Sequence, residues 1–296
     1  MKCTAIVVTY NGMKYYERCF GSLSSSNVPL EIIAVDNKSE DDTVRYISEK
    51  YPLVKIVPCD KNYGFARANN IALKMARQNN ADFYFLLNQD AWIEKDTVEK
   101  LTAFSVNNPE YGIISPVHLT GDKGHFDRGF IKYFHQCSET LRAYENLFLK
   151  KAEPDCYDSR FVNAAAWLVT KKCLETVGGF DTLMFRHYGE DGNYCQRVLY
   201  HGMKIGILTS TTICHDREQR EDRPIDKKVV FSEFYANILL GKKAYLKRLL
   251  IMMIKIISIK RSKDGLSELL FLITNIHKIL KSRKRNKTNG GGKLNW

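Results

Sequence analysis

The 296-residue sequence has no long hydrophobic run. No uninterrupted apolar stretch reaches the roughly 18 residues needed to cross a bilayer, so we expect no membrane-spanning helix. The first residues, MKCTAIVVTYNG, contain only a short apolar run and no small-residue cleavage site, which argues against an export signal. We interpret that run as a buried first strand.

Paired cysteines and a dinucleotide fingerprint are also absent. The eight cysteines are scattered, without the close spacing of zinc knuckles, so we expect reduced thiols that pack in the core of a cytoplasmic protein. No G-x-G-x-x-G follows any expected strand, which disfavours a dinucleotide-dependent oxidoreductase.

What the sequence does contain is an α/β rhythm. With 44% hydrophobic residues, the chain can bury a full core, as one large domain or as a domain with an appendage. Over residues 1–117, short apolar runs alternate with longer amphipathic ones, which predicts βαβ units and a mostly parallel sheet flanked by helices. The expected strands are 4–8, 31–35, 54–57, 83–87 and 112–116, and the expected helices lie near 13–24, 41–50, 65–78 and 95–106.

The second half is less regular. Residues 118–158 show no clean period, so we expect loops and one helix near 138–150. Order returns with an apolar strand at 161–169, and after Pro224 the pattern is entirely helical. Between that strand and Pro224 we expect a helix at 171–177, the Gly178-Gly179 turn, a helix at 190–200 and strands at 204–208 and 211–214. After Pro224 we expect helices near 227–241, 243–259 and 265–282.

The net charge of +12 is concentrated near the C-terminus. Residues 242–287 contain fourteen Lys and Arg against Asp264 and Glu268. Apolar helices with cations spaced through them favour binding to anionic lipid headgroups. The alternative is that these helices pack on the rest of the protein with their cations in water. Nucleic acid is not expected, because no recognisable reader module accompanies the charge.

Polar clusters follow four of the expected strands, where an open parallel sheet binds its ligands. Any one of them could be ordinary turn chemistry, but four along one edge favour a binding site. They are Thr9-Tyr10-Asn11, Asp36-Asn37, Asn62-Tyr63-Gly64 and Asn88-Gln89-Asp90.

Five segments, in order, resemble the motifs of family 2 glycosyltransferases with the GT-A fold: AIVVTYNG, VDNKSEDDT, NYGFARANNIAL, FLLNQDAWI and GGFDTLMFRHYGEDGNYCQR. Within that family, the segments resemble those of bacterial rhamnosyltransferases of surface polysaccharide synthesis. The resemblance implies inverting transfer of a sugar from a nucleotide diphosphate sugar to a hydroxyl of a saccharide acceptor, which we expect to be lipid-linked.

The resemblance also implies a division of the chain. We expect a GT-A catalytic domain at 1–223, with a nucleotide-binding half at 1–117 and an acceptor-binding half at 118–223. A basic helical extension at 224–289 and a flexible tail at 290–296 follow. We expect the enzyme to lie peripherally on the inner face of the plasma membrane, and nothing in the sequence indicates its oligomeric state.

Donor contacts are implied at the first three clusters and at Asn88. Gly64 ahead of a helix suits a diphosphate, because a residue without a side chain lets backbone amides approach the anion; a simple turn is the alternative. The implied nucleotide-sugar-binding residues are Thr9, Tyr10, Asn11, Asp36, Asn62, Gly64, Phe65, Asn70 and Asn88.

A metal site is implied where Asn88-Gln89-Asp90 replaces the family's Asp-x-Asp. Mg²⁺ or Mn²⁺ needs few protein carboxylates when phosphate oxygens and water complete its shell, so Asp90 alone can suffice. His215 aligns with a histidine that in some relatives joins the metal or the diphosphate. Its alternative role is that of an ordinary buried histidine.

The general base is implied at Asp191, which would take the proton of the acceptor hydroxyl. The alternative is that Glu190 and Asp191 are acids favoured at a helix N-terminus, whose dipole would lower the pKa of Asp191. Asn163, Trp167 and Glu190 fall where relatives bind the acceptor, although a single Trp in an apolar strand is commonly a core residue.

Two other functions remain open. Asn88 and Asn193 stand where relatives carry acids, which leaves room for a catalytically degenerate sugar-nucleotide-binding or scaffold protein. A sugar nucleotidylyltransferase is disfavoured, because its first strand would end in a glycine-rich loop with a basic residue.

Overall fold

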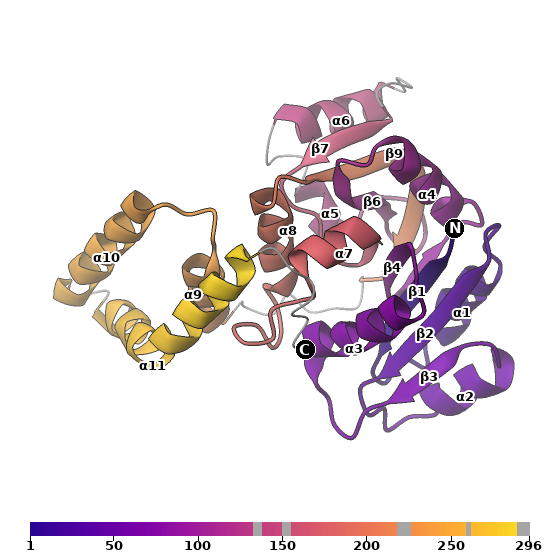
Figure 1. The fold of residues 1–296 in the computed structure, drawn as a ribbon, viewed down its shortest axis with the longest axis horizontal. Coiled ribbons are helices and arrows are strands. Elements are labelled where there is room, and N and C mark those ends of the chain that lie inside the picture. The colour runs from indigo at the N-terminus through magenta and orange to yellow at the C-terminus, as the bar shows by residue number, and fades with distance from the viewer. Residues whose placement is uncertain (133–137, 150–154, 218–225, 259–261, 289–296) are drawn as a thin grey trace.

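The computed structural model of the chain describes residues 1–132, 138–149, 155–217, 226–258 and 262–288. Figure 1 shows a central sheet with helices packed around it and a group of C-terminal helices standing to one side. In these residues the strand order of the nine-stranded sheet is β3-β2-β1-β4-β8-β6-β9-β5, with β7 paired to β9.

The N-terminal half of the sheet is parallel, as the sequence predicts. Strands β3, β2, β1 and β4 lie side by side in one direction, and each crossover is a helix, which is how parallel neighbours are connected. All of these elements were predicted. Their bounds are β1 Cys3–Thr9, α1 Tyr16–Ser24, β2 Leu30–Asp36, α2 Thr43–Lys50, β3 Lys55–Pro58, α3 Gly64–Gln78 and β4 Phe83–Asn88.

The other half of the sheet is mixed. Strand β8 (Ala166–Thr170) runs antiparallel to both β4 and β6 (Tyr111–Leu119), and β9 (Lys204–His215) is parallel to β6. Two short strands, β5 (Ala91–Ile93) and β7 (Cys156–Ser159), pair antiparallel with β9.

Three details of the strand prediction were wrong. The strand expected at 161–169 begins only at Ala166, and β5 and β7 were not expected at all. The two closing strands are one strand, β9, whose register with β6 shifts between Pro116 and Val117. The polar residues near Ser210 that suggested a break therefore belong to a bulge, which adds residues to one strand without ending it.

Helices fill the connections of this half. The segment at 118–158 contains more structure than expected, since β6 extends into it and it also holds α5 and β7. The helices of this half of the sheet are α4 Thr97–Asn107, α5 Arg128–Ile131, α6 Ser138–Phe148, α7 Lys171–Val177 and α8 Glu190–Tyr200.

The sheet separates two apolar cores. Alternate residues of β1 point to opposite faces: Ile6 belongs to the core beneath α3, α7 and α8, and Ala5 and Val7 belong to the core beneath α1 and α4. Because both faces are covered, the strands are apolar throughout, which is why their sequences show runs in place of a clean alternation.

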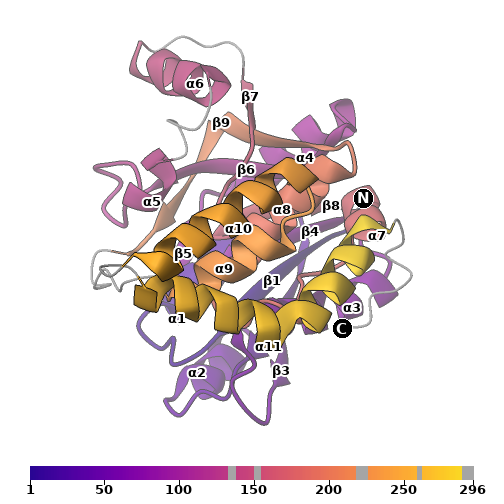
Figure 2. The same cartoon turned by 90° about the vertical axis from the view of Figure 1, so that its left-hand side faces the viewer.

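The C-terminal helices form a layer of their own beside the sheet, in front of it in Figure 2. They are α9 (Lys227–Ala236), α10 (Lys242–Ile257) and α11 (Ser262–Lys287). Among the described residues, no helix has the length and apolar character to span a membrane.

A buried ion pair holds the three helices together. Glu268 of α11 is fully buried, pairs with Arg248 of α10 through both carboxylate oxygens, and accepts a hydrogen bond from the Tyr235 hydroxyl of α9 at 2.8 Å. The α10–α11 crossing is tight at Gly265, where a Cβ atom would lie 2.8 Å from the backbone nitrogen of Ile256.

A second polar contact joins these helices to the sheet domain. The buried carboxylate of Asp181, in the turn after α7, accepts hydrogen bonds from the Ser282 hydroxyl and from the Asn286 amide at 2.9 Å. The backbone N–H of Ile238 donates to the Gln196 side chain of α8 at 2.8 Å. The helical layer is therefore tied to the turn and the helix that flank the candidate site described below.

We expect Ser282→Ala to lower the free energy of unfolding by about 1.5–3 kcal/mol, because it removes a buried hydrogen bond to a charged carboxylate. Ser267→Ala, on an exposed face of the same helix, is the matched control and should change it by less than about 0.5 kcal/mol. Urea unfolding followed by tryptophan fluorescence measures both; equal effects would mean that the Ser282–Asp181 contact contributes nothing.

Candidate functional site

The site begins where β1, β2 and β4 end. The parallel register sets Thr9 beside Asp36 and Val8 beside Asn88. The buried Thr9 hydroxyl donates to the Asp36 carboxylate at 3.1 Å, and Ser39 donates to the same carboxylate through its amide at 2.9 Å and its hydroxyl at 2.5 Å. Asp36 is thus a fixed acceptor at the edge of the sheet.

The loop after β1 is held in a defined shape by its neighbours. The Tyr10 backbone exchanges two hydrogen bonds with the Gln89 side chain, at 2.9 and 3.1 Å. Asn11 has a left-handed φ of 46°, receives a bond from the Glu40 amide at 2.8 Å and donates through its own amide to Ser39 at 2.9 Å. The Tyr10 ring is 43% exposed and therefore open to a planar ligand.

The N-terminus of α3 joins the same edge. The Asn37 side chain accepts from the Tyr63 backbone amide at 3.2 Å, and the Asn62 side-chain oxygen Oδ1 accepts from the Gly64 backbone amide at 2.9 Å. Gly64 has a φ of 80°, and a Cβ there would lie 2.4 Å from the carbonyl oxygen of Arg186. Glycine is therefore required here for structural reasons: another residue would be strained at this φ, and its Cβ would clash with the loop that contains Arg186.

Two of the expected donor contacts point elsewhere. Asn70 is fully buried, and its amide exchanges two hydrogen bonds with the Phe180 backbone, at 2.8 and 3.0 Å. The Phe65 ring packs edge-on against the Phe180 ring at 5.7 Å. As a correction, both residues fasten α3 to the turn at 178–181, because the Asn70 amide and the Phe65 ring both contact Phe180.

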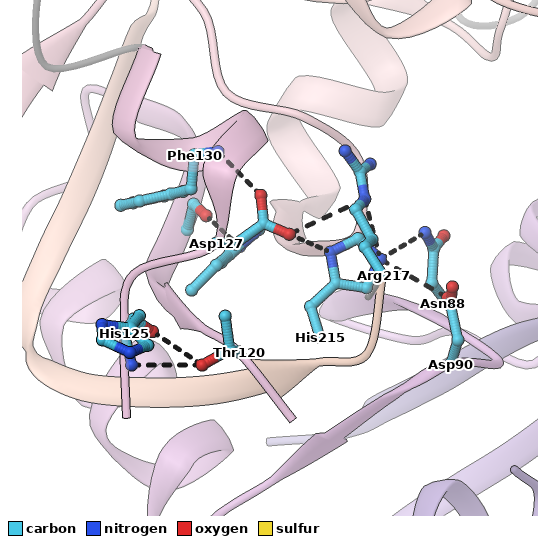
Figure 3. A network of polar contacts seen from close by, with 10 residues as sticks. Asn88, Asp90, Thr120, His125, Asp127, Phe130, His215 and Arg217 are labelled. Carbon is cyan, nitrogen blue, oxygen red and sulfur yellow. Dashed lines mark hydrogen bonds and ion pairs between the residues drawn. The ribbon is translucent and has the colours of Figure 1, made fainter. Parts of the chain in front are cut away.

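A chain of charged groups lies beyond the end of β4 (Figure 3). The pairing of β5 with β9 sets Ala91 opposite His215, and this brings His215 Nε2 to 3.4 Å from the Asp90 carboxylate. On its other side, His215 Nδ1 lies 3.3 Å from the carboxylate of Asp127. The Asn88 amide nitrogen is 3.4 Å from His215 Nε2.

Asp127 determines how His215 is oriented. Asp127 is buried, caps α5 by accepting from the Phe130 amide at 2.8 Å, and lies 3.7 Å from Arg217 Nε. Burial lowers the pKa of His215, but bonding to Asp127 and Asp90 outweighs burial, and the net shift is upward. In the protonated imidazole, Nδ1–H is directed at Asp127 and Nε2–H at Asp90. Loss of the Nε2 proton would leave a lone pair that can bind a cation held by Asp90, while Nδ1 keeps its proton toward Asp127.

These residues fit a divalent cation that takes most of its ligands from substrate and water. A carboxylate and a histidine backed by a second carboxylate can contribute to the ligands of such an ion. Within the described residues, no cluster of three His, Cys, Asp or Glu side chains could hold a metal ion alone. Asp90 and His215 would therefore need the oxygens of a bound phosphate group.

Two carboxylates begin α8 on the other side of the site. Burial and the neighbouring Asp191 raise the pKa of Glu190 to about 7. Burial also raises the pKa of Asp191. Hydrogen bonds from backbone amides act in the opposite direction, the largest being that from Gly192 at 2.8 Å, and so does the charge of Arg217. The helix dipole expected to weaken Asp191 as a base is thus outweighed by desolvation.

Buried polar atoms without partners gather near these acids. Both amide atoms of Asn163, both of Asn193 and Oε2 of Glu190 are buried and find no hydrogen-bond partner in the described part of the chain. The amide of Ala164, next to Asn163, bonds to Asp191, which places Asn163 beside that carboxylate. Such orphaned groups are rare in folded proteins and are typical of ligand sites.

Trp167 is not part of this surface. Its side chain is fully buried in β8 and stacks against Phe180 at 6.2 Å, with Tyr194 at 5.8 Å. The expected sugar-stacking role of Trp167 is therefore wrong, and the core alternative holds, because no face of the indole reaches solvent.

Three charged residues of the site were missed from the sequence. Asp127 was missed because only the fold brings it to His215. Arg217 lies two residues after His215 but was missed because it belongs to no recognisable motif. Glu233 of α9 was missed because it belongs to the C-terminal helices. Its Oε1 lies 3.5 Å from where a Cβ of Gly192 would stand, and repulsion by Asp191 adds to burial in raising its pKa.

Comparison with known proteins identifies the family of the chain. The model of the family described as "Glycosyl transferase family 2" matches residues 4–170. In sequence, the chain is 24% identical over 212 residues to dTDP-rhamnosyl transferase RfbF of Shigella flexneri, covering 71% of this chain and 68% of that protein.

A second relative, N-acetylglucosaminyl-diphospho-decaprenol L-rhamnosyltransferase of Mycobacterium tuberculosis, is 22% identical over 240 residues, 74% of this chain and 77% of its own length. Among solved structures, Staphylococcus aureus TarS 1–349 in complex with UDP-GlcNAc aligns with a TM-score of 0.62 at 15% identity, covering 97% of this chain and 89% of that one. The fold is therefore the GT-A fold, as expected.

Proposed function

Because the chain belongs to glycosyl transferase family 2, we propose that it transfers a sugar, with inversion, from a nucleotide diphosphate sugar to a hydroxyl of a lipid-linked saccharide. The observation that carries the proposal is the position of Asp191. This half-buried carboxylate has a raised pKa and lies beside the unpartnered amide of Asn163.

The donor would bind along the ends of β1, β2 and β4. Asp36 is a fixed acceptor for hydroxyl or N–H groups of the ribose or base, and the exposed Tyr10 ring offers a stacking surface. The diphosphate would extend toward Asn88 and Asp90, with Arg217 as a nearby cation. RfbF is named as a dTDP-sugar enzyme and the aligned TarS structure holds UDP-GlcNAc, which supports a nucleotide diphosphate sugar without fixing its base.

The chemistry assigned to Asp191 is general base catalysis. Its carboxylate takes the proton from the acceptor hydroxyl while that oxygen forms a bond to the anomeric carbon on the face opposite the diphosphate. The bond from the anomeric carbon to the diphosphate oxygen breaks, and the nucleoside diphosphate leaves with the electron pair. A raised pKa makes Asp191 a stronger base than an ordinary aspartate.

Asp90 and His215 are the residues that would hold a divalent cation, with Asp127 orienting His215. When bound, such an ion neutralises the negative charge that develops on the departing diphosphate. Asn163 and Glu190 would bind the acceptor, since their unpartnered atoms can exchange hydrogen bonds with sugar hydroxyls. With a pKa of about 7, Glu190 can donate as well as accept near neutral pH.

We expect Asp191→Asn to lower the transfer rate by about 100- to 10,000-fold, the usual contribution of a general base, while nucleoside diphosphate binding stays within about threefold. In the wild type, the rate should fall as pH drops through the raised pKa, because protonated Asp191 cannot accept the hydroxyl proton. Initial rates against pH, with nucleotide binding by calorimetry, measure both effects.

Asp96→Asn is the matched control for this experiment, since Asp96 precedes another helix, α4, and should leave the rate unchanged. Full transfer by the Asp191→Asn variant would remove Asp191 from the role of base. Absence of transfer by the wild type itself, with nucleotide binding kept, would favour the degenerate sugar-nucleotide-binding alternative.

Metal dependence gives a separate expectation. A chelator should abolish transfer, and added Mg²⁺ or Mn²⁺ should restore it. Asp90→Ala should weaken nucleoside diphosphate binding in the presence of Mg²⁺ by at least tenfold but should change it little in a chelator. The exposed Asp122→Ala is the control. Transfer that survives both chelation and Asp90→Ala would refute the cation site.

We further propose that α10 and α11 hold the enzyme on the inner face of the plasma membrane. Large apolar side chains are exposed along both helices, among them Ile257 at 83%, Ile254 at 58% and Leu270 at 63%. Fourteen cations lie on the same segment. Apolar insertion and attraction to anionic headgroups act together on such a surface, and the M. tuberculosis relative is named for a lipid-linked substrate.

Point substitutions test this better than truncation, because α11 supplies two donors to Asp181. We expect the wild type to float with phosphatidylglycerol vesicles and the double variant Ile254→Glu with Ile257→Glu to remain in the dense fraction. Leu53→Glu, at an exposed position on the sheet domain, is the control and should float. Equal flotation of all three proteins would contradict membrane binding.

A further inference from the structure

A groove of about 520 Å³ lies among α9, α10 and α11, apart from the site described above. Its floor is buried, with Tyr235 and Ile279 each only 3% exposed, and its wall is open, with Ile273 65% and Leu280 61% exposed. A volume of this size is in the range of pockets that bind small ligands.

The lining changes character along α11. From Leu272 to Leu280 the residues that line the groove are aliphatic, and the next lining residue is Arg283. Arg283 follows Ser282, which bonds to Asp181 in the turn next to α8. The charged end of the groove is therefore the end nearest the sheet domain, and the aliphatic end points away from it.

Arg283 keeps donors available at that end. All of its hydrogen bonds to described residues come from Nη1, which donates to the backbone oxygens of Tyr235 and Asn237 and to the hydroxyl of Tyr245. A guanidinium has five N–H donors in a planar fork that suits phosphate oxygens.

We propose that this groove binds the isoprenoid chain of a polyprenyl diphosphate-linked acceptor, with the diphosphate beside Arg283. The assignment rests on the proposed function, because it concerns the lipid part of that acceptor. An aliphatic trough that ends in a cation matches a branched hydrocarbon chain that ends in an anion. Burial of the chain removes apolar surface from water, and Arg283 neutralises the head.

Helix α9 connects the groove with the reacting groups. Its Tyr235 lines the groove, whereas Glu233, two residues earlier, lies against the Gly189–Gly192 segment at the start of α8, where Asp191 stands. A saccharide attached to the diphosphate at Arg283 would extend from the groove across α9 toward Asp191. The same helix would thus border both the lipid and the sugar of one acceptor.

Binding of farnesyl diphosphate, a soluble isoprenoid diphosphate, tests the groove directly by calorimetry on the full chain. We expect the wild type to bind it at least tenfold more tightly than inorganic diphosphate. Ile276→Trp should weaken binding at least tenfold by filling the groove. Leu280→Trp is a second filling variant, in case the first fails to fold.

Leu270→Trp is the matched control: it adds the same side chain to an exposed position of α11 that does not line the groove, and its affinity should stay within twofold. Equal binding by wild type and both filling variants would overturn the proposal. So would equal affinity for monomeric dihexanoyl phosphatidylglycerol, which would assign the groove to membrane acyl chains. Sedimentation tests a third occupant. If the wild type forms a dimer and Ile276→Trp dissociates it, the groove would be assigned to a second copy of the chain.

The measurement is independent of catalysis. Asp191→Asn should bind farnesyl diphosphate like the wild type, so loss of transfer in that variant reports on the reaction alone. If the groove variants lose farnesyl diphosphate but the wild type transfers no sugar, the proposed reaction fails and the lipid site stands. If transfer occurs and the groove variants bind normally, the lipid site fails alone.

Discussion

The parallel register of β1, β2 and β4 is the constraint on which the rest of the molecule depends. It ends three strands at one level, so that Thr9 meets Asp36 and the chain turns at Asn88 beside them. The Thr9–Asp36 hydrogen bond can form only in this register. A slip by one residue would turn every side chain of a strand to the other face of the sheet. Both apolar cores would be lost, together with the polar site at the ends of the strands.

The residues proposed to bind the acceptor are positioned differently. Helices that pack on the outside of the sheet hold them in place. Asp191 lies at the start of α8, α8 is fixed by Gln196 to the chain after α9, and Asp181 is fixed by α11. The raised pKa of Asp191 follows from this enclosure, since burial outweighs the amides at the helix end. The C-terminal helices therefore contribute to the chemistry assigned to the sheet domain.

The sequence predicted what depends on local pattern. The parallel strands, their helices and the clusters after each strand follow from apolar periodicity and turn residues, and the motif order indicated the family. It could not predict contacts made by distant segments: Asp127 meets His215 only because β6, which precedes Asp127, pairs with β9, which ends at His215. Trp167 and Asn70 were misjudged because motif position does not reveal which way a side chain faces, and here both face Phe180.

The bonds from Ser282 and Asn286 to Asp181 have a consequence for synthesis on the ribosome. About a hundred residues separate Asp181 from these partners, and at ordinary elongation rates that interval lasts roughly 5–20 s. During it, the nascent sheet domain carries a buried carboxylate without two of its donors. The turn before α8 can reach its final state only when α11 has left the ribosome, so the order of synthesis delays the completion of this turn.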